Sequence, residues 1–249
     1  MIKAVLIDID NTLILFDEED FFRRYLGRLA PAFSDLMSRE EFLTRLIGAS
    51  RTLLRNRGAR TNADHYMEDF TRGMDGNRGE IWNRFTRFYE DGFEALRACV
   101  TPIEGVRGVI DELRRDGLKL VAASHPLWPE RVQQIRLGWA GLDPLDFHHI
   151  THIENTAFCK PQPGYYQEIC DVLRVPPGEC LMVGNDLIND MAAAAIGMKT
   201  YLTTDAEENG FVSFEMSRKF RENPSETIPE PDFRGSLRAV PETVRRLVT

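Results

Sequence analysis

Residues 3–12 read KAVLIDIDNT, an apolar run that stops at two aspartates spaced two positions apart. The run has no polar alternation, which is typical of a strand that is buried on both faces of a sheet. Asp8 and Asp10 follow where this strand leaves the core, although buried carboxylates are costly unless they are paired or bound to a cation. Alone, the pattern fits either a functional site or a plain turn, because Asp-Asn-Thr is also good turn chemistry.

The whole chain has the composition of a globular protein. Its 249 residues include 43% hydrophobic and 28% charged side chains. A formal net charge of -8 argues against nucleic acid or an anionic membrane as the partner. No stretch approaches the ~20 apolar residues of a membrane span, and the first residues lack the pattern of a signal peptide. We therefore expect a cytoplasmic protein, and we leave its oligomeric state open.

Cysteine usage agrees with a reducing compartment. The cysteines form no CxxC pair and no spacing that is typical of a zinc site, so free thiols are the simplest interpretation. The four residues are Cys99, Cys159, Cys170 and Cys180.

Strands and helices alternate from residue 101 onward, which predicts an α/β fold with a parallel sheet and right-handed crossovers. After the first strand we expect strands at residues 118–123, 147–150, 180–183, 199–203 and 232–236. We expect helices at residues 106–115, 132–139, 164–173, 190–196 and 241–248, and a polar surface excursion at residues 205–231.

Residues 16–100 have a different character. Apolar side chains recur at three- and four-residue spacing, as at Phe21, Tyr25 and Leu29, and glycines punctuate the stretch. This pattern predicts an all-helical insertion. We therefore divide the chain into an α/β core, residues 1–15 and 101–249, and a helical domain, residues 16–100.

Polar residues gather at the ends of the predicted strands. Ser124 follows the second strand and Asp186 follows the fourth. The carboxyl ends of parallel strands share one edge of the sheet, where open α/β proteins bind their ligands. These side chains should therefore converge with Asp8 and Asp10, which favours a functional site over a turn.

Four stretches at these strand ends resemble the motifs of the haloacid dehalogenase (HAD) superfamily, in the family's order. Residues 8–12 resemble the DxDxT motif, Ser124 the Ser/Thr motif, Lys160 before Pro161 the lysine motif, and residues 184–190 the acidic motif. The resemblance covers the first strand and residues 101–203, and it implies a Rossmann-like core. The helical insertion is similar to the family's type C1 cap.

The resemblance implies a Mg²⁺-dependent phosphatase that hydrolyses a small phosphorylated metabolite through an aspartyl-phosphate. Asp8 would be the nucleophile, and Asp10 would protonate the leaving oxygen and later activate water. Ser124 and Lys160 would bind and neutralise the phosphoryl group. Mg²⁺ prefers oxygen ligands, here Asp8, the backbone carbonyl of Asp10, and Asp186. The substrate-binding residues implied are Asn11, Thr12, Ser124, His125 and Lys160.

Two positions depart from the family's pattern. His125 stands where relatives often carry Asn, and it could contact substrate or only fill the gap. Asn185 stands where many relatives carry Asp, and it could offer a metal only a neutral oxygen, so we assign the charged ligand to Asp186. Asp190 could join the metal site or could simply be a favourable acid at the start of a helix.

Simpler structural interpretations also exist. Ser124 could cap the following helix, and Lys160 could be a solvated loop lysine. The basic run at residues 51–60 could be a solvated helix end or could meet the substrate's anionic leaving group. The histidines 148, 149 and 152 fall on a predicted strand and loop where neighbouring side chains diverge, which argues against a shared metal.

Three other functions compete with a phosphatase. A phosphomutase of the same superfamily would share every catalytic residue. A dehalogenase would keep the nucleophile but would not need Asp10 as a second acid. A non-catalytic HAD-fold binding protein would be free to lose Asp8, Asp10 or Lys160, and all three are present.

Overall fold

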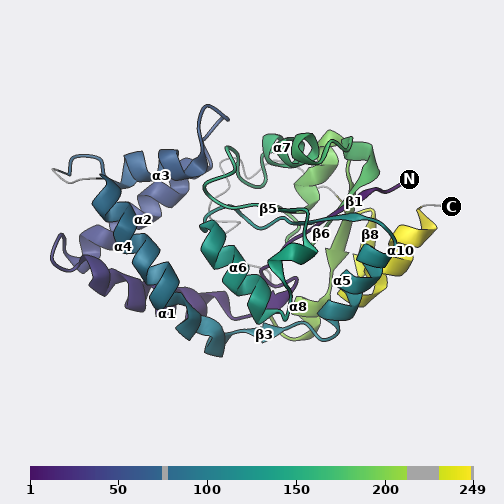
Figure 1. Ribbon diagram of the computed structural model, residues 1–249, viewed down its shortest axis with the longest axis horizontal. Helices are drawn as coiled ribbons and strands as arrows, with labels where there is room; N and C mark the ends of the chain where they lie inside the picture. The colour runs from purple at the N-terminus through teal and green to yellow at the C-terminus, as the bar shows by residue number, and fades with distance from the viewer. Residues whose placement is uncertain (75–77, 212–229, 248–249) are drawn as a thin grey trace.

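The computed structural model describes residues 1–74, 78–211 and 230–247, and it confirms the predicted α/β fold. Its main sheet has six parallel strands in the order β5-β4-β1-β6-β7-β8 (Figure 1). The strands are β1 (Ala4–Ile7), β4 (Lys119–Ala122), β5 (His149–Ile150), β6 (Cys180–Gly184), β7 (Lys199–Thr203) and β8 (Phe233–Gly235). A separate antiparallel pair consists of β2 (Ile14–Leu15) and β3 (Thr101–Pro102).

Strand β1 lies near the middle of the sheet, between β4 and β6. Its last residue, Ile7, is in register with Ala122 of β4 and Val183 of β6. The backbone N–H of Asp8 still donates to the Val183 carbonyl at 2.9 Å. The three strands therefore end together, and their following residues share one edge, as the sequence predicts.

Helices cover both faces of the sheet and give three layers. Val5 and Ile7 belong to the larger hydrophobic core with α5 (Val106–Arg115), α6 (Glu130–Trp139) and α10 (Val240–Arg246). Ala4 and Leu6 point to the opposite face and pack with α7 (Pro163–Leu173) and the 3-10 segment η5 (Met191–Ile196). This alternation explains why β1 is apolar at every position. The shorter elements are η3 (Pro144–Asp146), η4 (Pro177–Glu179), α8 (Asp205–Glu208) and η6 (Leu237–Ala239).

The described residues between β2 and β3 form only helices and their connections, as expected from the apolar spacing. Three helix starts are capped by a side-chain oxygen that accepts from the third helical N–H, at Asp17, Ser38 and Thr61. The elements are α1 (Glu18–Leu29), η1 (Ala30–Phe33), α2 (Arg39–Leu53), α3 (Asn62–Phe70), α4 (Arg78–Asp91) and η2 (Phe93–Cys99). They form the helical end of the elongated molecule in Figure 1.

Aromatic side chains join this helical region to the α/β core. Trp128, in the loop between β4 and α6, lies 4.9 Å from the Tyr25 ring and 5.5 Å from the Phe93 ring, centroid to centroid. Phe93 also stacks on Trp139 of α6 at 5.3 Å. Aromatic contacts of this kind contribute beyond the area they bury, so the two parts share one continuous hydrophobic cluster.

Some predicted elements differ in detail. The first strand is limited to four residues, because the chain turns away at Asp8. The alanine-rich segment at residues 190–196 is not an α-helix; it is the 3-10 segment η5. It ends at Gly197, whose φ of 86° is left-handed and suits glycine. Of the predicted excursion at residues 205–231, residues 212–229 lie outside the described part of the chain.

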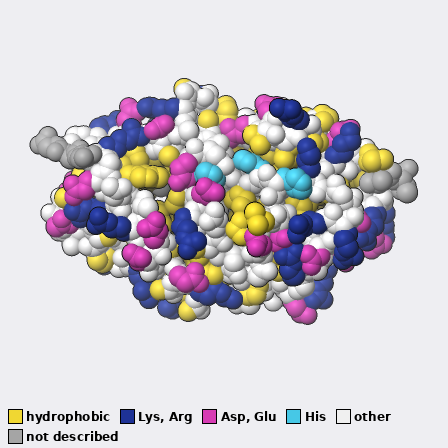
Figure 2. All heavy atoms as spheres, viewed as in Figure 1, with side chains coloured by type: hydrophobic (Ala, Val, Ile, Leu, Met, Phe, Trp, Pro, Cys, Tyr) yellow, Lys and Arg dark blue, Asp and Glu magenta, His cyan; other side chains and the backbone are white. Residues whose placement is uncertain are grey.

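All four cysteines are free thiols, three of them buried. No helix within the described residues is long and apolar enough to cross a membrane. Figure 2 shows basic and acidic side chains interspersed over both the helical and the α/β end of one face.

Candidate active site

Asp8 and Lys160 form the centre of the site. The Lys160 ammonium donates to Asp8 Oδ1 at 2.8 Å and to Asp190 Oδ1 at 2.6 Å. Lys160 and Asp190 are each 1% exposed. Lys160 is therefore not a solvated loop lysine, and the structure brings together the lysine motif, the DxDxT motif and the acidic motif.

The two carboxylates determine the charge of this buried lysine. Burial alone would lower the pKa of Lys160, but Asp190 and Asp8 raise it well above its ordinary value. The ammonium is therefore charged at neutral pH, as neutralisation of an anionic substrate requires. Burial acts in the opposite direction on Asp190 and raises its pKa, against the attraction of Lys160.

Asp190 is held in place by the backbone around it. Its Oδ2 accepts from the Asp186 N–H at 3.0 Å. A Cβ at Gly184 would come within 2.0 Å of that same oxygen, so only glycine fits there. Asp190 is therefore the second partner of Lys160, a role beyond that of a favourable acid at the start of a helix.

Asp10 is paired with an arginine that the sequence analysis did not identify. Its carboxylate forms an ion pair with Arg136 of α6, whose side chain is 2% exposed. The same guanidinium donates to Ser124 Oγ at 3.3 Å and to Gln133 Oε1 at 2.6 Å. Burial lowers the pKa of Arg136 to about 10, which leaves it cationic at neutral pH.

Ser124 lies fully buried at the end of β4, at the same edge of the sheet as Asp8. It is not a helix cap, because α6 begins at Glu130 and its N-cap residue is Pro129. The Ser124 carbonyl accepts from Thr151 Oγ1 at 3.0 Å and from Tyr165 Oη at 2.8 Å. These bonds fix the backbone that carries the Ser124 hydroxyl.

Asn11 and Thr12 hold the loop after β1 in its shape. Asn11 has a left-handed φ of 53°, which asparagine tolerates better than most residues. Its side chain accepts from the Phe16 N–H at 3.1 Å and donates to Glu18 Oε1 at 3.3 Å. Thr12 Oγ1 donates to Asn185 Oδ1 at 3.2 Å and so links the DxDxT and acidic motifs.

Asp186 lies at the carboxyl end of β6, where the sequence places it. Its Oδ1 accepts from the backbone N–H groups of Ile188 at 2.7 Å and Asn189 at 2.9 Å. Its Oδ2 accepts from the Asn189 side chain at 3.1 Å. These bonds fix the orientation of the Asp186 carboxylate within the turn.

Glu18, at the start of α1, is a further acid beside the site. Burial, together with the negative charges of Asp186 and Asp8, raises its pKa to about 8, although Asn11 opposes the shift. Negative charge is therefore concentrated at this edge of the sheet. The sequence alone does not distinguish Glu18 as a site residue, because an acid in the first turn of a helix has an ordinary explanation.

His125 follows Ser124 and reaches the same region. Burial, together with the nearby charge of Lys160, lowers its pKa to about 4, against the attraction of Asp186. The ring is therefore neutral at pH 7. Its Nδ1 is buried, and no residue in the described part of the chain hydrogen-bonds to it.

The donor set at this edge fits a hard divalent cation. Asp8 and Asp186 could offer carboxylate oxygens and the Asp10 carbonyl a third oxygen, and Mg²⁺ usually completes its shell with water and substrate oxygens. Besides burial, the negative charges of Asp186 and Asp8 raise the pKa of Glu18, and such a concentration of acids suits a cation. No cluster of three or more His, Cys, Asp or Glu side chains suited to a metal occurs among the described residues, but a site with two carboxylates does not require one.

The histidines at 148, 149 and 152 make separate contacts. His148 Nδ1 accepts from the Leu120 N–H at 3.2 Å, whereas His152 Nδ1 lies 2.6 Å from Glu154 Oε2. The expectation that these side chains diverge therefore agrees with the structure.

The basic run at residues 51–60 ends in a loop that docks on the loop carrying Lys160. Gln162 Nε2 donates to the Leu54 carbonyl at 2.6 Å and the Asn56 carbonyl at 3.1 Å. Buried Asn62 donates to the Phe158 carbonyl at 2.9 Å. Arg60 instead forms an ion pair with Glu68 on the outside.

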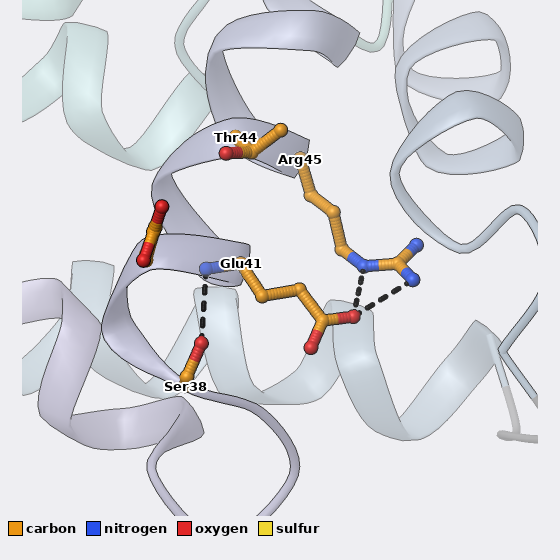
Figure 3. A pocket seen from close by; sticks show the side chains of 5 residues that line it. Ser38, Glu41, Thr44 and Arg45 are labelled. Atoms are coloured by element: carbon orange, nitrogen blue, oxygen red, sulfur yellow. Dashed lines mark hydrogen bonds and ion pairs between the residues drawn. The ribbon is translucent and has the colours of Figure 1, made fainter.

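A surface hollow at the start of α2 lies apart from this site (Figure 3). Within it, Ser38 Oγ accepts from the Glu41 N–H at 3.1 Å and Arg45 pairs with Glu41 at 2.9 Å. A helix cap and an i,i+4 ion pair are ordinary features of a helix start, so the hollow indicates no function. It is lined by Ser38, Glu40, Glu41, Thr44 and Arg45.

Comparison with known proteins shows a family and a shared fold. The model of the haloacid dehalogenase-like hydrolase family matches residues 2–197. Haloacid dehalogenase-like hydrolase domain-containing protein 3 of Xenopus laevis is 27% identical over 117 residues, so the match spans 47% of this chain and only 46% of that relative.

Solved structures share the fold over nearly the whole chain. A HAD phosphatase from Thermococcus onnurineus superposes with a TM-score of 0.57 at 20% identity and covers 98% of both chains. An L-2-haloacid dehalogenase from Xanthobacter autotrophicus, with chloropropionic acid covalently bound, gives 0.55 at 19% identity over 98% of this chain and 99% of its own. The family match covers most of the sequence, and the chain belongs to the haloacid dehalogenase-like hydrolases.

Proposed function

We propose that this hydrolase is a Mg²⁺-dependent phosphatase that acts on a small phosphorylated metabolite through an aspartyl-phosphate. The observation that carries the proposal is the Asp8 carboxylate at the end of the central strand, 2.8 Å from the buried ammonium of Lys160. A carboxylate beside a fixed cation can approach an anionic phosphoryl group that would otherwise repel it. Asp10, two residues further on, is placed for proton transfer.

In the first half-reaction, an Asp8 carboxylate oxygen attacks phosphorus while the bond from phosphorus to the leaving oxygen breaks. The Asp10 carboxyl gives its proton to that leaving oxygen. In the second half-reaction, water attacks the aspartyl-phosphate and its proton passes to Asp10. The bond between phosphorus and Asp8 breaks, which releases inorganic phosphate and restores the Asp8 carboxylate.

The remaining residues bind charge. The Ser124 hydroxyl donates to a phosphoryl oxygen, and the Lys160 ammonium neutralises negative charge on the phosphoryl group and on Asp8. Asp8, the Asp10 carbonyl and Asp186 would hold Mg²⁺, which would neutralise the phosphoryl oxygens and orient them for in-line attack. The oxygen-rich donor set supports this choice of ion.

We further propose that residues 16–100 act as a cap over residues 1–15 and 101–249. A cap excludes water and restricts the site to small substrates. Support comes from the loop at residues 54–62, which is hydrogen-bonded to the segment carrying Lys160. Glu18, at the first turn of this region, lies beside Asp8 and Asp186.

A dehalogenase is the second candidate, because a structural neighbour is an L-2-haloacid dehalogenase. Displacement of halide needs a carboxylate nucleophile but no proton for the leaving group. The presence of Asp10 favours the phosphatase, since a dehalogenase gives that second acid no task.

Two parallel assays test the proposal. Purified protein with Mg²⁺ is incubated with a panel of phosphate esters that includes p-nitrophenyl phosphate, and separately with 2-chloropropionate. We expect release of inorganic phosphate that chelation abolishes, and no release of chloride. Chloride release without phosphatase activity would establish the dehalogenase. Isomerisation of a sugar phosphate without net release of phosphate would establish the phosphomutase.

A further inference from the structure

Arg136 is a buried cation on the core-facing side of α6. It is 1% exposed, and its neighbours Ile135 and Leu137 are buried too. Burial of a guanidinium costs several kcal/mol unless partners compensate for the lost water. The identity of those partners therefore indicates what the arginine does.

Its partners converge on the proposed catalytic groups. One terminal nitrogen forms the ion pair with Asp10, and the other donates to Ser124 Oγ at 3.3 Å and Gln133 Oε1 at 2.6 Å. The guanidinium carbon also lies 5.9 Å from the centre of the Trp128 ring. Gln133 is itself anchored, because its Nε2 donates to the Thr151 carbonyl at 2.9 Å.

We infer that Arg136 is a positioning residue for Asp10, an inference that rests on the proposed phosphatase function. The guanidinium fixes the position of the Asp10 carboxyl, so that this group can protonate the leaving oxygen of the substrate. The same guanidinium fork occupies one lone pair of the Ser124 hydroxyl. The Ser124 proton is then free to point away from Arg136, toward a phosphoryl oxygen.

Positioning of Asp10 predicts a dependence on the leaving group. An alkyl phosphate expels an alkoxide that needs the proton from Asp10, whereas p-nitrophenyl phosphate expels a stable phenolate that needs none. Loss of Arg136 should therefore slow the alkyl ester much more than the aryl ester. A purely structural arginine, or one that binds the phosphoryl group directly, would affect both esters alike, because they share that group.

The experiment compares Arg136→Met with Arg131→Met, a matched change at an exposed position of the same helix. Kinetics with ethyl phosphate and p-nitrophenyl phosphate are measured in Mg²⁺. We expect Arg136→Met to lower kcat for ethyl phosphate by ~10²-fold and for p-nitrophenyl phosphate by about tenfold or less, as for a displaced general acid. Arg131→Met should match the wild type on both esters. Arg136→Lys should show the same bias with a smaller loss, because it keeps the charge and loses the fork.

A second comparison uses the Asp10→Asn background, measured with p-nitrophenyl phosphate. If Arg136 acts through Asp10, adding Arg136→Met to Asp10→Asn should lower kcat by less than about threefold further. The reason is that the effects of two groups that act as one unit are not additive. The double variant removes both charges of the pair and leaves no buried charge unpaired. It should therefore stay folded and allow the test even if Arg136→Met alone unfolds. Equal losses on both esters, or full additivity with Asp10→Asn, would overturn the inference. A wild-type protein that hydrolyses neither ester would instead reject the phosphatase itself.

Discussion

The Lys160 ammonium lies 2.8 Å from the Asp8 carboxylate, although 152 positions separate the two residues in the chain. Both side chains are almost inaccessible, at 1% and 10% exposure. A buried ion pair is weak evidence for a gain in stability, because desolvation offsets much of the attraction. The position of this ion pair at the end of the central strand points instead to a chemical role for the charges.

Removal of the lysine should cost both activity and stability. Lys160→Met leaves Asp8 and Asp190 as unpaired carboxylates, which should lower the free energy of unfolding by about 3–5 kcal/mol. Denaturant unfolding measures this loss, and phosphatase assays should find no turnover. Lys3→Met is the control, since Lys3 makes an exposed pair with Glu179 and should cost less than ~1 kcal/mol. Equal stability of the two variants would show that Lys160 is not needed to balance the buried acids.

Glycine at position 184 should be required by the carboxylate beside it. Gly184→Ala puts a methyl group within 2.0 Å of Asp190 Oδ2, so Asp190 must move away from Lys160. We expect a loss of about 1–3 kcal/mol in unfolding free energy, together with reduced turnover. Gly108→Ala, within α5 and with open space around it, should instead stabilise the fold by roughly 0.5–1 kcal/mol. Shifts of the same sign in both variants would contradict the steric argument.

The sheet could be predicted from the sequence because its strands obey simple rules. An apolar stretch without alternation, such as residues 4–7, is compatible with a strand covered on both faces. The strand ends then place Asp8, Ser124 and Asp186 at one edge. The 3-10 form of η5 could not be predicted, since four successive alanines favour an α-helix. Tertiary contacts prevail there, because the Asp190 carboxylate before η5 is fixed by Lys160 and the Asp186 N–H.

The residues that contact the motif residues could be predicted from the sequence less readily than the motifs themselves. The Arg136 guanidinium contacts Asp10 and Ser124, and the Gln133 side-chain amide contacts Arg136. Such long-range contacts cannot be predicted from the spacing of residues along the helix. One signal was available: Arg136 lies four residues after Val132 and three before Trp139, on a face where a charge is unexpected. Glu18 carried no such signal, because acids are common at a helix start.

Stability should depend on pH through Glu18. Its folded pKa of about 8 lies above the ordinary 4.5, so the folded state holds a proton that the unfolded state releases. The contribution of this proton to the free energy of unfolding is fully present below pH 4.5 and is lost as the pH rises toward 8. In chelator, Glu18→Gln should therefore match the wild type at pH 4.5 and exceed its unfolding free energy at pH 8. Glu19→Gln, at the exposed neighbouring position, should show no such divergence. A wild-type stability that rises between these two pH values relative to Glu18→Gln would contradict the assignment.

The nucleophile can be tested with a nearly isosteric change. Asp8→Asn keeps the shape of the side chain and leaves Lys160 paired with Asp190. We expect turnover of p-nitrophenyl phosphate to fall below detection, while thermal unfolding shifts by only a few degrees. Mass spectrometry of acid-quenched wild-type enzyme should find phosphate on Asp8. A rate near that of the wild type in Asp8→Asn would move the nucleophile elsewhere.

The proposed metal site involves two adjacent residues that differ in charge and in hydrogen bonding. Asn185 Oδ1 already accepts from Thr12 at 3.2 Å, whereas Asp186 offers a charged carboxylate fixed by the turn. Asp186→Asn keeps an oxygen for the Ile188 and Asn189 N–H groups but removes the charge. It should raise the Mg²⁺ concentration for half-maximal activity by about tenfold or more, in line with the loss of one anionic ligand. Asn185→Ala, which also releases Thr12, should raise it less. Calorimetric titration of Mg²⁺ into the resting proteins separates affinity from turnover, and the reverse order of the two variants would make Asn185 the ligand.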